Sequence, residues 1–424
     1  MRISLNRLLQ ADGFCVFYAE GVGFFAFKED FMLTSIALIL LSGLFLSFIF
    51  SKMKLPGLLG MILAGIILGP YALNLIDASV LNISADLRQI ALVIILTRAG
   101  LSLNLTDLKK IGRPALLMCF VPALVEMTGT IIFAPLLFGV TTLEAALMGS
   151  VIAAVSPAVV VPRMIKLIDE GYAKDKRIPQ LILAGASVDD IFVIVVFTVL
   201  TSFASTGKIV GTDFLQIPLS IVTGILLGVV TGLALVLFFK KVHIRDPIKV
   251  MIILSISFLF LEAEQRLEGI VPVSALIGIM STGITVNQKY DILSKRLSVK
   301  YNKLWLCAEI FLFVLVGAAV DLKYAFAAGL SSVVLVVAAL IFRMSGVFIS
   351  LIKTNLNKKE RLFCMLSYTP KATVQAAIGT IPLSMGLSCG SIILTVAVIS
   401  ILITAPFGAI CIDKLHRKML EKQN

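Results

Sequence analysis

The sequence contains few charged residues, few histidines and no paired cysteine motif. Charged residues make up 15% of its 424 residues, whereas 59% are hydrophobic. A soluble protein of this length could not bury so many apolar side chains in a core, so lipid must be the solvent for most of the chain. The composition excludes an ordinary soluble protein and predicts a polytopic membrane protein.

The shortage of metal-binding residues limits the sites that the chain can build. Its six cysteines are scattered without a C-x-x-C pair, and its two histidines, His243 and His416, lie in basic connectors. Disulfide frameworks and zinc sites are therefore weakly supported, and no cofactor is expected. The net charge of +12 does not indicate nucleic acid, because the Lys and Arg residues form short clusters between apolar runs.

Thirteen apolar runs can cross a bilayer, although the shorter ones must be tilted, broken or extended by flanking residues. They lie at residues 31–51, 55–73, 89–105, 114–139, 145–162, 180–204, 214–239, 248–261, 270–286, 304–320, 324–352, 362–387 and 390–411. Alternate connectors and the C-terminal tail carry 27 of the 37 Lys and Arg residues, and the opposite connectors carry 4. By the positive-inside rule, this asymmetry predicts an all-α protein with about 13 transmembrane helices and a cytoplasmic C-terminus.

Residues 1–30 fit this pattern less well, because Glu20 interrupts the apolar stretch at 13–27. One hypothesis is a short extra helix, and another is the hydrophobic region of a signal peptide, although no small-residue cleavage site follows it. A third hypothesis starts the protein at Met32, since the residues just before it can be encoded by a ribosome-binding sequence.

The thirteen runs divide into six, one and six. The uninterrupted run 214–239 would act as a linker helix, and a single odd span inverts the second six-helix repeat relative to the first. The fifth run of each half contains a proline, Pro157 in SPAVVVP and Pro370 in TPKATVQAAIG. Because such a proline removes a backbone hydrogen bond, the pair predicts two broken helices that cross near the middle of the membrane. Interrupted segments at matching positions are typical of a transporter's binding site.

Five ionisable residues lie deep within apolar runs, where each is costly unless it is paired or faces water. They are Glu126, Asp189, Asp190, Arg343 and Lys371. At 1.5 Å per helical residue, these charges from four different runs lie roughly 15–20 Å from the cytoplasmic ends of their helices, near the middle of a ~30 Å core. A common depth predicts a single site.

Asp189 and Asp190 are adjacent, so on a helix their side chains diverge by about 100° and should serve separate tasks. Removal from water favours the protonated form of a carboxylate. A carboxylate that holds either a proton or a cation, but not both, is the minimum machinery of an antiporter. An intramembrane aspartyl protease needs its two aspartates on different helices, so an enzyme is not expected.

Four motifs, RAGLSL at 98–103, SPAVVVP at 156–162, AGASVDDIFVI at 184–194 and TPKATVQAAIG at 369–379, together resemble the monovalent cation/proton antiporter superfamily. The likeness is greatest to the Asp-Asp branch, which includes the animal mitochondrial and plasma-membrane sodium/proton antiporter-like proteins. It covers nearly the whole chain from Met32 onward. The resemblance implies exchange of Na⁺, and also Li⁺, for H⁺ across the cell membrane by an elevator-type alternating-access mechanism, in the service of cation and pH homeostasis.

The resemblance also implies a lipid-embedded homodimer in which each protomer has a dimerisation domain and a six-helix core. The implied boundaries are 31–105 and 248–320 for the halves of the dimerisation domain, 114–204 (spans 4–6) and 324–411 (spans 11–13) for the halves of the core, 214–239 for the linker helix and 412–424 for the cytoplasmic tail.

The resemblance also implies roles for individual residues of the site. Asp190 resembles the family's ion- and proton-binding carboxylate, which here would hold Na⁺. Asp189 resembles the aspartate that a basic residue of span 11 engages, and that residue is Arg343 here. Glu126 resembles an acidic partner of the same arginine.

Two further positions depart from the pattern or extend it. Ser156 stands where one branch has an aspartate before the proline, and it offers a hydroxyl for the ion instead. Lys371 resembles a basic residue that compensates the carbonyl ends of half-helices. For Thr373 and Gln375, simple helix packing is the favoured interpretation.

Two alternatives to sodium/proton exchange stay open at this point. A K⁺/H⁺ antiporter would use the same residues, because selectivity depends on oxygen positions that no sequence gives. A sodium-coupled organic-solute symporter is the alternative from a different class, since crossed broken helices also serve such substrates.

Overall fold

The computed structural model describes residues 14–17, 24–27, 32–103, 112–173, 175–206, 213–267 and 273–422. In chain order, its strands and helices are β1 (Phe14–Phe17), β2 (Phe24–Phe27), α1 (Met32–Lys52), α2 (Gly57–Leu68), α3 (Ala78–Asn82), α4 (Ser84–Ser102), α6 (Arg113–Met118), α7 (Val121–Phe138), α8 (Thr142–Ile152), α9 (Pro157–Asp169), α10 (Ile178–Thr206), α11 (Asp213–Lys241), α12 (Asp246–Leu267), α13 (Ala275–Lys289), α14 (Asp291–Ala318), α15 (Leu322–Ser350), α16 (Lys358–Ser367), α17 (Thr373–Ile378), α18 (Ile381–Ser384) and α19 (Gly390–Met419).

The two segments described within residues 1–30 are strands. β1 and β2 pair antiparallel, with Phe14 opposite Phe27. The hypothesis of an extra helix over 13–27 is therefore wrong for these segments, whose backbone groups bond between strands. The rest of 1–30 lies outside the described part of the chain.

Every one of the thirteen predicted runs falls on helix, so the helical polytopic fold is confirmed from Met32 onward in the described residues. Among these residues, eight helical segments are long and apolar enough to cross a membrane. The other predicted runs fall on the short helices α2 and α13, on the more highly charged α4 and α12, and on α16–α18, which divide the run 362–387 between them.

The two broken runs begin in the same way. At the start of α8, Thr141 and Glu144 form a capping box in which each side chain accepts from the other's backbone N–H, at 3.3 and 2.8 Å. Asn357 and Glu360 form the same box at the start of α16, at 2.9 and 2.7 Å. Such boxes bond N–H groups that a helix start leaves free. α8 then runs for 11 residues and α16 for 10 before each chain breaks, as expected for an internal repeat.

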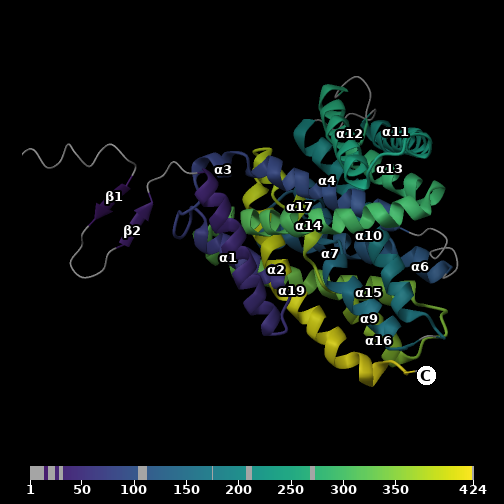
Figure 1. The fold of residues 1–424 in the computed structure, drawn as a ribbon. Coiled ribbons are helices and arrows are strands. Elements are labelled where there is room, and N and C mark those ends of the chain that lie inside the picture. Colours follow the sequence, from purple (N-terminus) through teal and green to yellow (C-terminus); the bar gives the residue numbers. More distant parts are fainter. Residues whose placement is uncertain are drawn as a thin grey trace, which may run out of the picture.

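The helices pack in two groups, which can be followed in Figure 1. In the first helix group, α14 packs against α2 and α4, α13 packs against α4 and α11, and α1 packs against α2. In the second helix group, α15 packs against α7 and α19, and α10 packs against α8 and α9. Contacts between the groups include α17 with α4 and α14, and α10 with α13.

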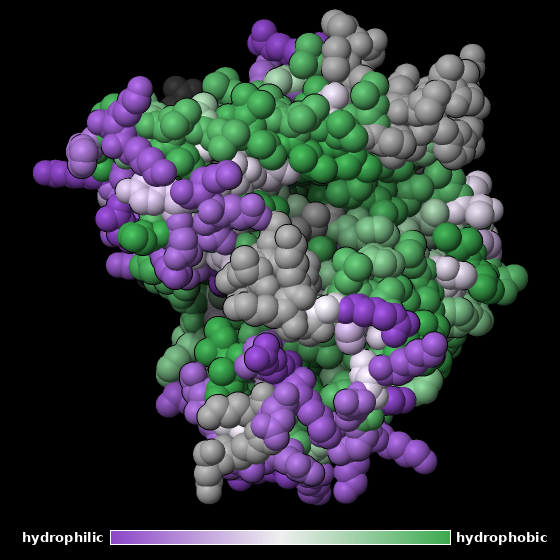
Figure 2. Space-filling view, turned by 90° about the vertical axis from the view of Figure 1, so that its right-hand side faces the viewer, coloured by the Kyte–Doolittle hydropathy of each residue, from purple (hydrophilic) through white to green (hydrophobic). Residues whose placement is uncertain are grey.

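The surface of the helical bundle is largely apolar. Figure 2 shows a broad hydrophobic band, with hydrophilic residues gathered toward the bottom and left of the view. Large apolar side chains such as Phe45 on α1, Leu226 on α11 and Leu330 on α15 are exposed. In contrast, 72% of the residues in an apolar 18-residue stretch of α8–α9 are buried, whereas 17% are buried in the corresponding stretch of α1. The broken helix α8–α9 thus lies inside the bundle, and the exposed apolar faces suit contact with lipid.

Glycines let α2 and α14 approach until their backbones touch. A Cβ on Gly65 would lie 1.9 Å from the carbonyl oxygen of Val314, and one on Gly317 would lie 2.2 Å from that of Ile62. Backbone atoms cannot rotate away as a side chain can. Small residues allow this kind of close packing between membrane helices.

We expect Gly317→Ala to lower the melting temperature of the detergent-purified protein, at a cost of about 1–3 kcal/mol for overpacking. Gly329→Ala on α15 is the matched control, because a Cβ there meets nothing within 4 Å. Alanine in place of glycine within a helix should be neutral or stabilising by up to ~1 kcal/mol where the added Cβ meets no neighbour. Equal melting temperatures for the two variants would contradict the close approach of α2 and α14.

Candidate functional site

The two broken helices meet where their chains are interrupted. α8 and α9 are separated by residues 153–156, and α16 and α17 by residues 368–372. The N–H of Ser156 donates to the carbonyl of Pro370 at 2.7 Å, so the two breaks are in contact. Pro157 is the first residue of α9, a position where the missing N–H costs nothing. The predicted prolines thus stand at the breaks.

The end of α8 leaves backbone carbonyls without helical partners, and side chains from the other half of the protein bond them. Lys371 Nζ donates to the carbonyl of Ile152, and Arg343 Nη1 donates to that of Ala153. Gln375 Nε2 donates to Ala154 O at 2.9 Å. These contacts place two positive charges at the negative end of a helix dipole, the task predicted for Lys371. Because Gln375 makes this bond, interpreting it as simple packing is wrong.

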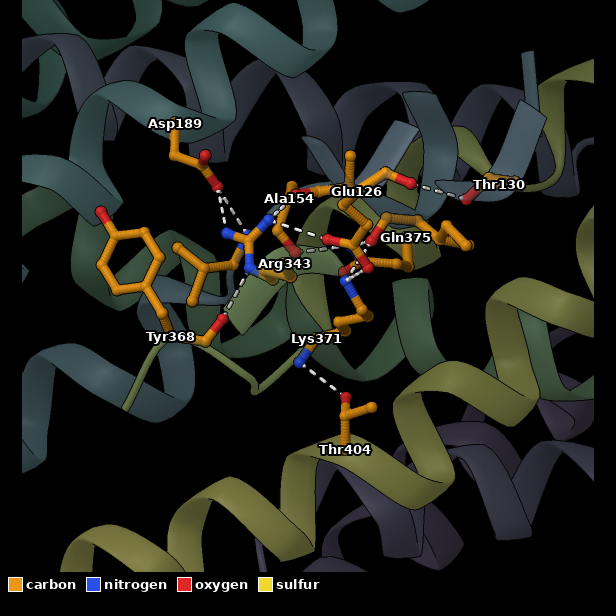
Figure 3. Close-up of polar contacts among 12 residues, drawn as sticks. Glu126, Thr130, Ala154, Asp189, Arg343, Tyr368, Lys371, Gln375 and Thr404 are labelled. Atoms are coloured by element: carbon orange, nitrogen blue, oxygen red, sulfur yellow. Dashed lines mark hydrogen bonds and ion pairs between the residues drawn. The ribbon is translucent and has the colours of Figure 1, made fainter. Parts of the chain in front are cut away.

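Arg343 lies at the centre of the site, as Figure 3 shows. Its Nη1 lies 2.9 Å from Glu126 Oε2, and its Nη2 lies 2.8 Å from Asp189 Oδ2. Its Nε donates to the carbonyl of Tyr368 at 2.6 Å. The side chains of Arg343, Glu126 and Asp189 are fully buried. The planar guanidinium can bond all these groups at once because it presents five N–H donors in a fixed fork.

Lys371 completes a neutral cluster. Its Nζ lies 2.6 Å from Glu126 Oε1, and both side chains are fully buried. Two cations, Arg343 and Lys371, therefore balance two carboxylates, Glu126 and Asp189. On the other side, Asp189 Oδ2 also accepts from the N–H of Val155 at 2.8 Å, which ties α10 to the break after α8.

Asp190 is the exception among the five charges that the sequence places deep in the membrane. It is only 8% exposed, yet it makes no ion pair with the described residues, and its Oδ1 has no hydrogen-bond partner among them. Its neighbour Asp189 faces Arg343, so the predicted divergence of the two side chains is present. An unpaired carboxylate in a dry site is costly when ionised.

Besides Asp190, two more of the predicted residues have side chains outside the hydrogen-bonded cluster. Ser156 is fully buried, and neither its hydroxyl nor that of Thr373 has a partner among the described residues. The sequence interpretation missed two others. Tyr368 supplies a carbonyl and lies with its ring centroid 5.3 Å from the Arg343 guanidinium, and the Thr404 hydroxyl accepts from the N–H of Lys371 at 2.9 Å. Two features of the sequence could have indicated these residues. Tyr368 stands directly before the TPKATVQAAIG motif, and Thr404 places a hydroxyl in the apolar run ISILITAPFG.

Two interrupted helices that cross beside buried charges define a class of secondary transporter built from repeats. The family model described as "Sodium/hydrogen exchanger, transmembrane" matches residues 36–415. The chain belongs to this sodium/hydrogen exchanger family, which is a family of membrane transporters and not of enzymes. The predicted resemblance is confirmed at this level.

Individual relatives agree with the family match. The chain is 33% identical over 389 residues to human sodium/hydrogen exchanger 9B2, an alignment that covers 87% of this chain and 70% of the relative. It is 31% identical over 382 residues to human sodium/hydrogen exchanger 9B1, with 87% and 73% covered. The structure of the sodium proton antiporter MjNhaP1 from Methanocaldococcus jannaschii at pH 8 has a TM-score of 0.79 at 20% identity, over 91% of this chain and 98% of that one. This last likeness shows the fold, and with the curated relatives it identifies a multi-pass membrane protein.

Arg343→Ala should destabilise the protein strongly, because it leaves Asp189 buried without an ion-pair partner and Glu126 with Lys371 alone, at a cost of ~3–5 kcal/mol. The measurement is the melting temperature of the purified variant in detergent. Arg266→Ala is the control: Arg266 pairs with Glu262 at 2.6 Å, but these side chains are 78% and 51% exposed. Surface pairs contribute about 0–1 kcal/mol. Similar losses in the two variants would show that the buried cluster does not depend on Arg343.

Proposed function

We propose that this protein exchanges Na⁺, and also Li⁺, for H⁺ across the cell membrane, with Asp190 binding the cation and the proton in competition. The observation that carries the proposal is the charge arrangement of the site. Glu126, Asp189, Arg343 and Lys371 neutralise one another. Of the five charges predicted to lie deep in the membrane, Asp190 alone makes no ion pair with the described residues, so its charge is left for a proton or a transported cation.

The oxygen atoms of the site fit a hard monovalent cation. Ser156 Oγ, Asp189 Oδ1 and Asp190 Oδ1 are buried and have no hydrogen-bond partner among the described residues. Carboxylate and carbonyl oxygens suit hard cations. We propose that Asp190 is the principal ligand and that Ser156 and Asp189 contribute oxygens.

The two helix groups support an elevator-type movement. We propose that the first helix group is the dimerisation scaffold and the second is the mobile core. A cavity of about 590 Å³ separates α10 of the core and the adjoining α6 from α11 and α13 of the scaffold. Apolar side chains such as Phe192, Ile225 and Met280 predominate in its lining. Such a surface has few hydrogen bonds to break when the core moves. We also propose a homodimer in the cell membrane with a cytoplasmic C-terminus, which the family likeness and the Lys and Arg distribution support.

Asp190→Asn should abolish exchange while the protein still folds, because the amide keeps the volume of the side chain but cannot take up and release the exchanged proton. The measurement is the dissipation of a pH gradient in proteoliposomes on addition of Na⁺. The control is Asp291→Asn, which removes an exposed carboxylate paired with Lys295 and should leave exchange intact. Asp190→Glu should retain exchange with weaker cation affinity.

The same assay separates the alternatives. Normal exchange by Asp190→Asn would refute the role of Asp190. A response to K⁺ but not to Na⁺ or Li⁺ would identify a potassium/proton antiporter. Sodium-driven uptake of an organic solute without proton movement would identify a symporter.

The neutral cluster also predicts the stoichiometry. An arginine side chain stays protonated under all physiological conditions. Arg343 should therefore hold Asp189 ionised throughout the cycle, leaving Asp190 as the only carboxylate that exchanges a proton. We expect one cation per proton and no net charge movement.

The test measures proton movement in proteoliposomes, where a voltage-sensitive dye reports the membrane potential. The rate of Na⁺-dependent proton movement should not change when a K⁺ diffusion potential is imposed with valinomycin. A rate that follows the imposed potential would mean that Asp189 or Lys371 carries a second proton.

A further inference from the structure

A polar cavity outside the ion site lies where the α1–α2 connection meets α9 and α19. Its volume is about 430 Å³, which falls within the range of roughly 300–1,000 Å³ typical of small-ligand pockets. Lys54 comes from the α1–α2 connection, Arg163 and Lys166 come from α9, and Arg417 comes from α19. The cavity therefore joins the first helix group to the second through four cations.

These cations exceed the acidic residues that line the same cavity. Arg163 pairs with Asp413 at 3.1 Å, and Lys166 lies 3.8 Å from Glu170. Lys54 and Arg417 make no ion pair with the described residues. Two positive charges from opposite helix groups are thus left uncompensated at the rim of one cavity, a pattern that attracts an anion.

His416 adds a buried polar group to the wall. It is 7% exposed, and its ring packs edge-on against Tyr172 at 5.0 Å. Its Nδ1 lies 3.0 Å from the carbonyl of Ile412. Since a carbonyl only accepts, Nδ1 carries a hydrogen, and Nε2 has no partner among the described residues. Nε2 is itself buried, so the exposed Lys54 and Arg417, and not His416, supply the open donors of the cavity.

We infer that this cavity binds a phosphate-type anion, either free phosphate or the headgroup of an anionic phospholipid. The anion bridges Lys54 of the first helix group and Arg417 of the second. If the core moves against the scaffold, as the proposed function requires, the bound anion holds the groups in the present arrangement and slows exchange. Binding itself does not depend on that movement, so it can be tested separately.

The binding test compares melting temperatures of the full-length protein in detergent, in sodium phosphate and in sodium chloride of equal ionic strength and pH. Phosphate should stabilise the wild type. The double variant Lys54→Gln/Arg417→Gln should bind about tenfold more weakly or worse, since hydrogen bonds to charged groups are lost. Its melting temperature in chloride reports whether it is folded.

The matched control is Lys52→Gln/Lys414→Gln. It removes the same charge from exposed positions on α1 and α19 that do not line the cavity, and it should respond to phosphate like the wild type. Equal stabilisation of both double variants by phosphate would overturn the assignment.

Mixed micelles containing phosphatidylglycerol or phosphatidylcholine distinguish the two sources of the anion. Stabilisation by phosphatidylglycerol but not by phosphate, lost in Lys54→Gln/Arg417→Gln, would identify a lipid headgroup. No stabilisation of the wild type by either would refute the site.

Exchange in phosphatidylglycerol and phosphatidylcholine proteoliposomes, each with and without phosphate, then tests regulation. The ligand should slow the wild type and not the cavity variant. Binding with unchanged exchange rates would refute the regulatory role, whereas a wild type that exchanges no ion would refute the proposed function and leave the binding site standing.

Discussion

Arg343 bonds to two carboxylates and to two backbone carbonyls in the breaks of the crossed helices, and the centre of the bundle depends on these contacts. A helix interrupted inside a membrane exposes carbonyls that lipid cannot bond, and each such group costs several kcal/mol. Positive side chains remove that cost, but they are themselves charges that need partners. Glu126 and Asp189 supply those partners, so the broken helices and the buried charges require one another.

This charge balance distinguishes Asp190 from the other four charges. Because the other four charges balance, the cluster around Arg343 has no net positive charge that could compensate the carboxylate of Asp190. One position along α10, Asp190 is buried in the same environment but makes no ion pair with the described residues. The rotation of about 100° between successive helical residues separates the carboxylate that pairs with Arg343 from one that makes no ion pair with the described residues.

The two halves of the chain show how much of this arrangement could be predicted. Each fifth run begins with a capping box, extends for about three turns and breaks beside a proline, and each of these features is a local property of the sequence. The roles of Gln375 and Thr404 could not be predicted in this way. Each bonds a backbone group that is free only because another helix breaks nearby, and a pattern along one helix does not report its neighbours.

The sequence by itself determined that lipid surrounds the protein, where its helices lie and which charges fall within apolar runs, because hydropathy and the spacing of charged residues are properties of each run alone. It also determined the family, since four motifs stand in order along one chain. Only the tertiary structure decided that Lys371 shares Glu126 with Arg343, and that Lys54 and Arg417 line one cavity. The physical reason is that pairing energies depend on distances of a few ångströms between residues more than 200 positions apart, and only the packing of the helices sets those distances.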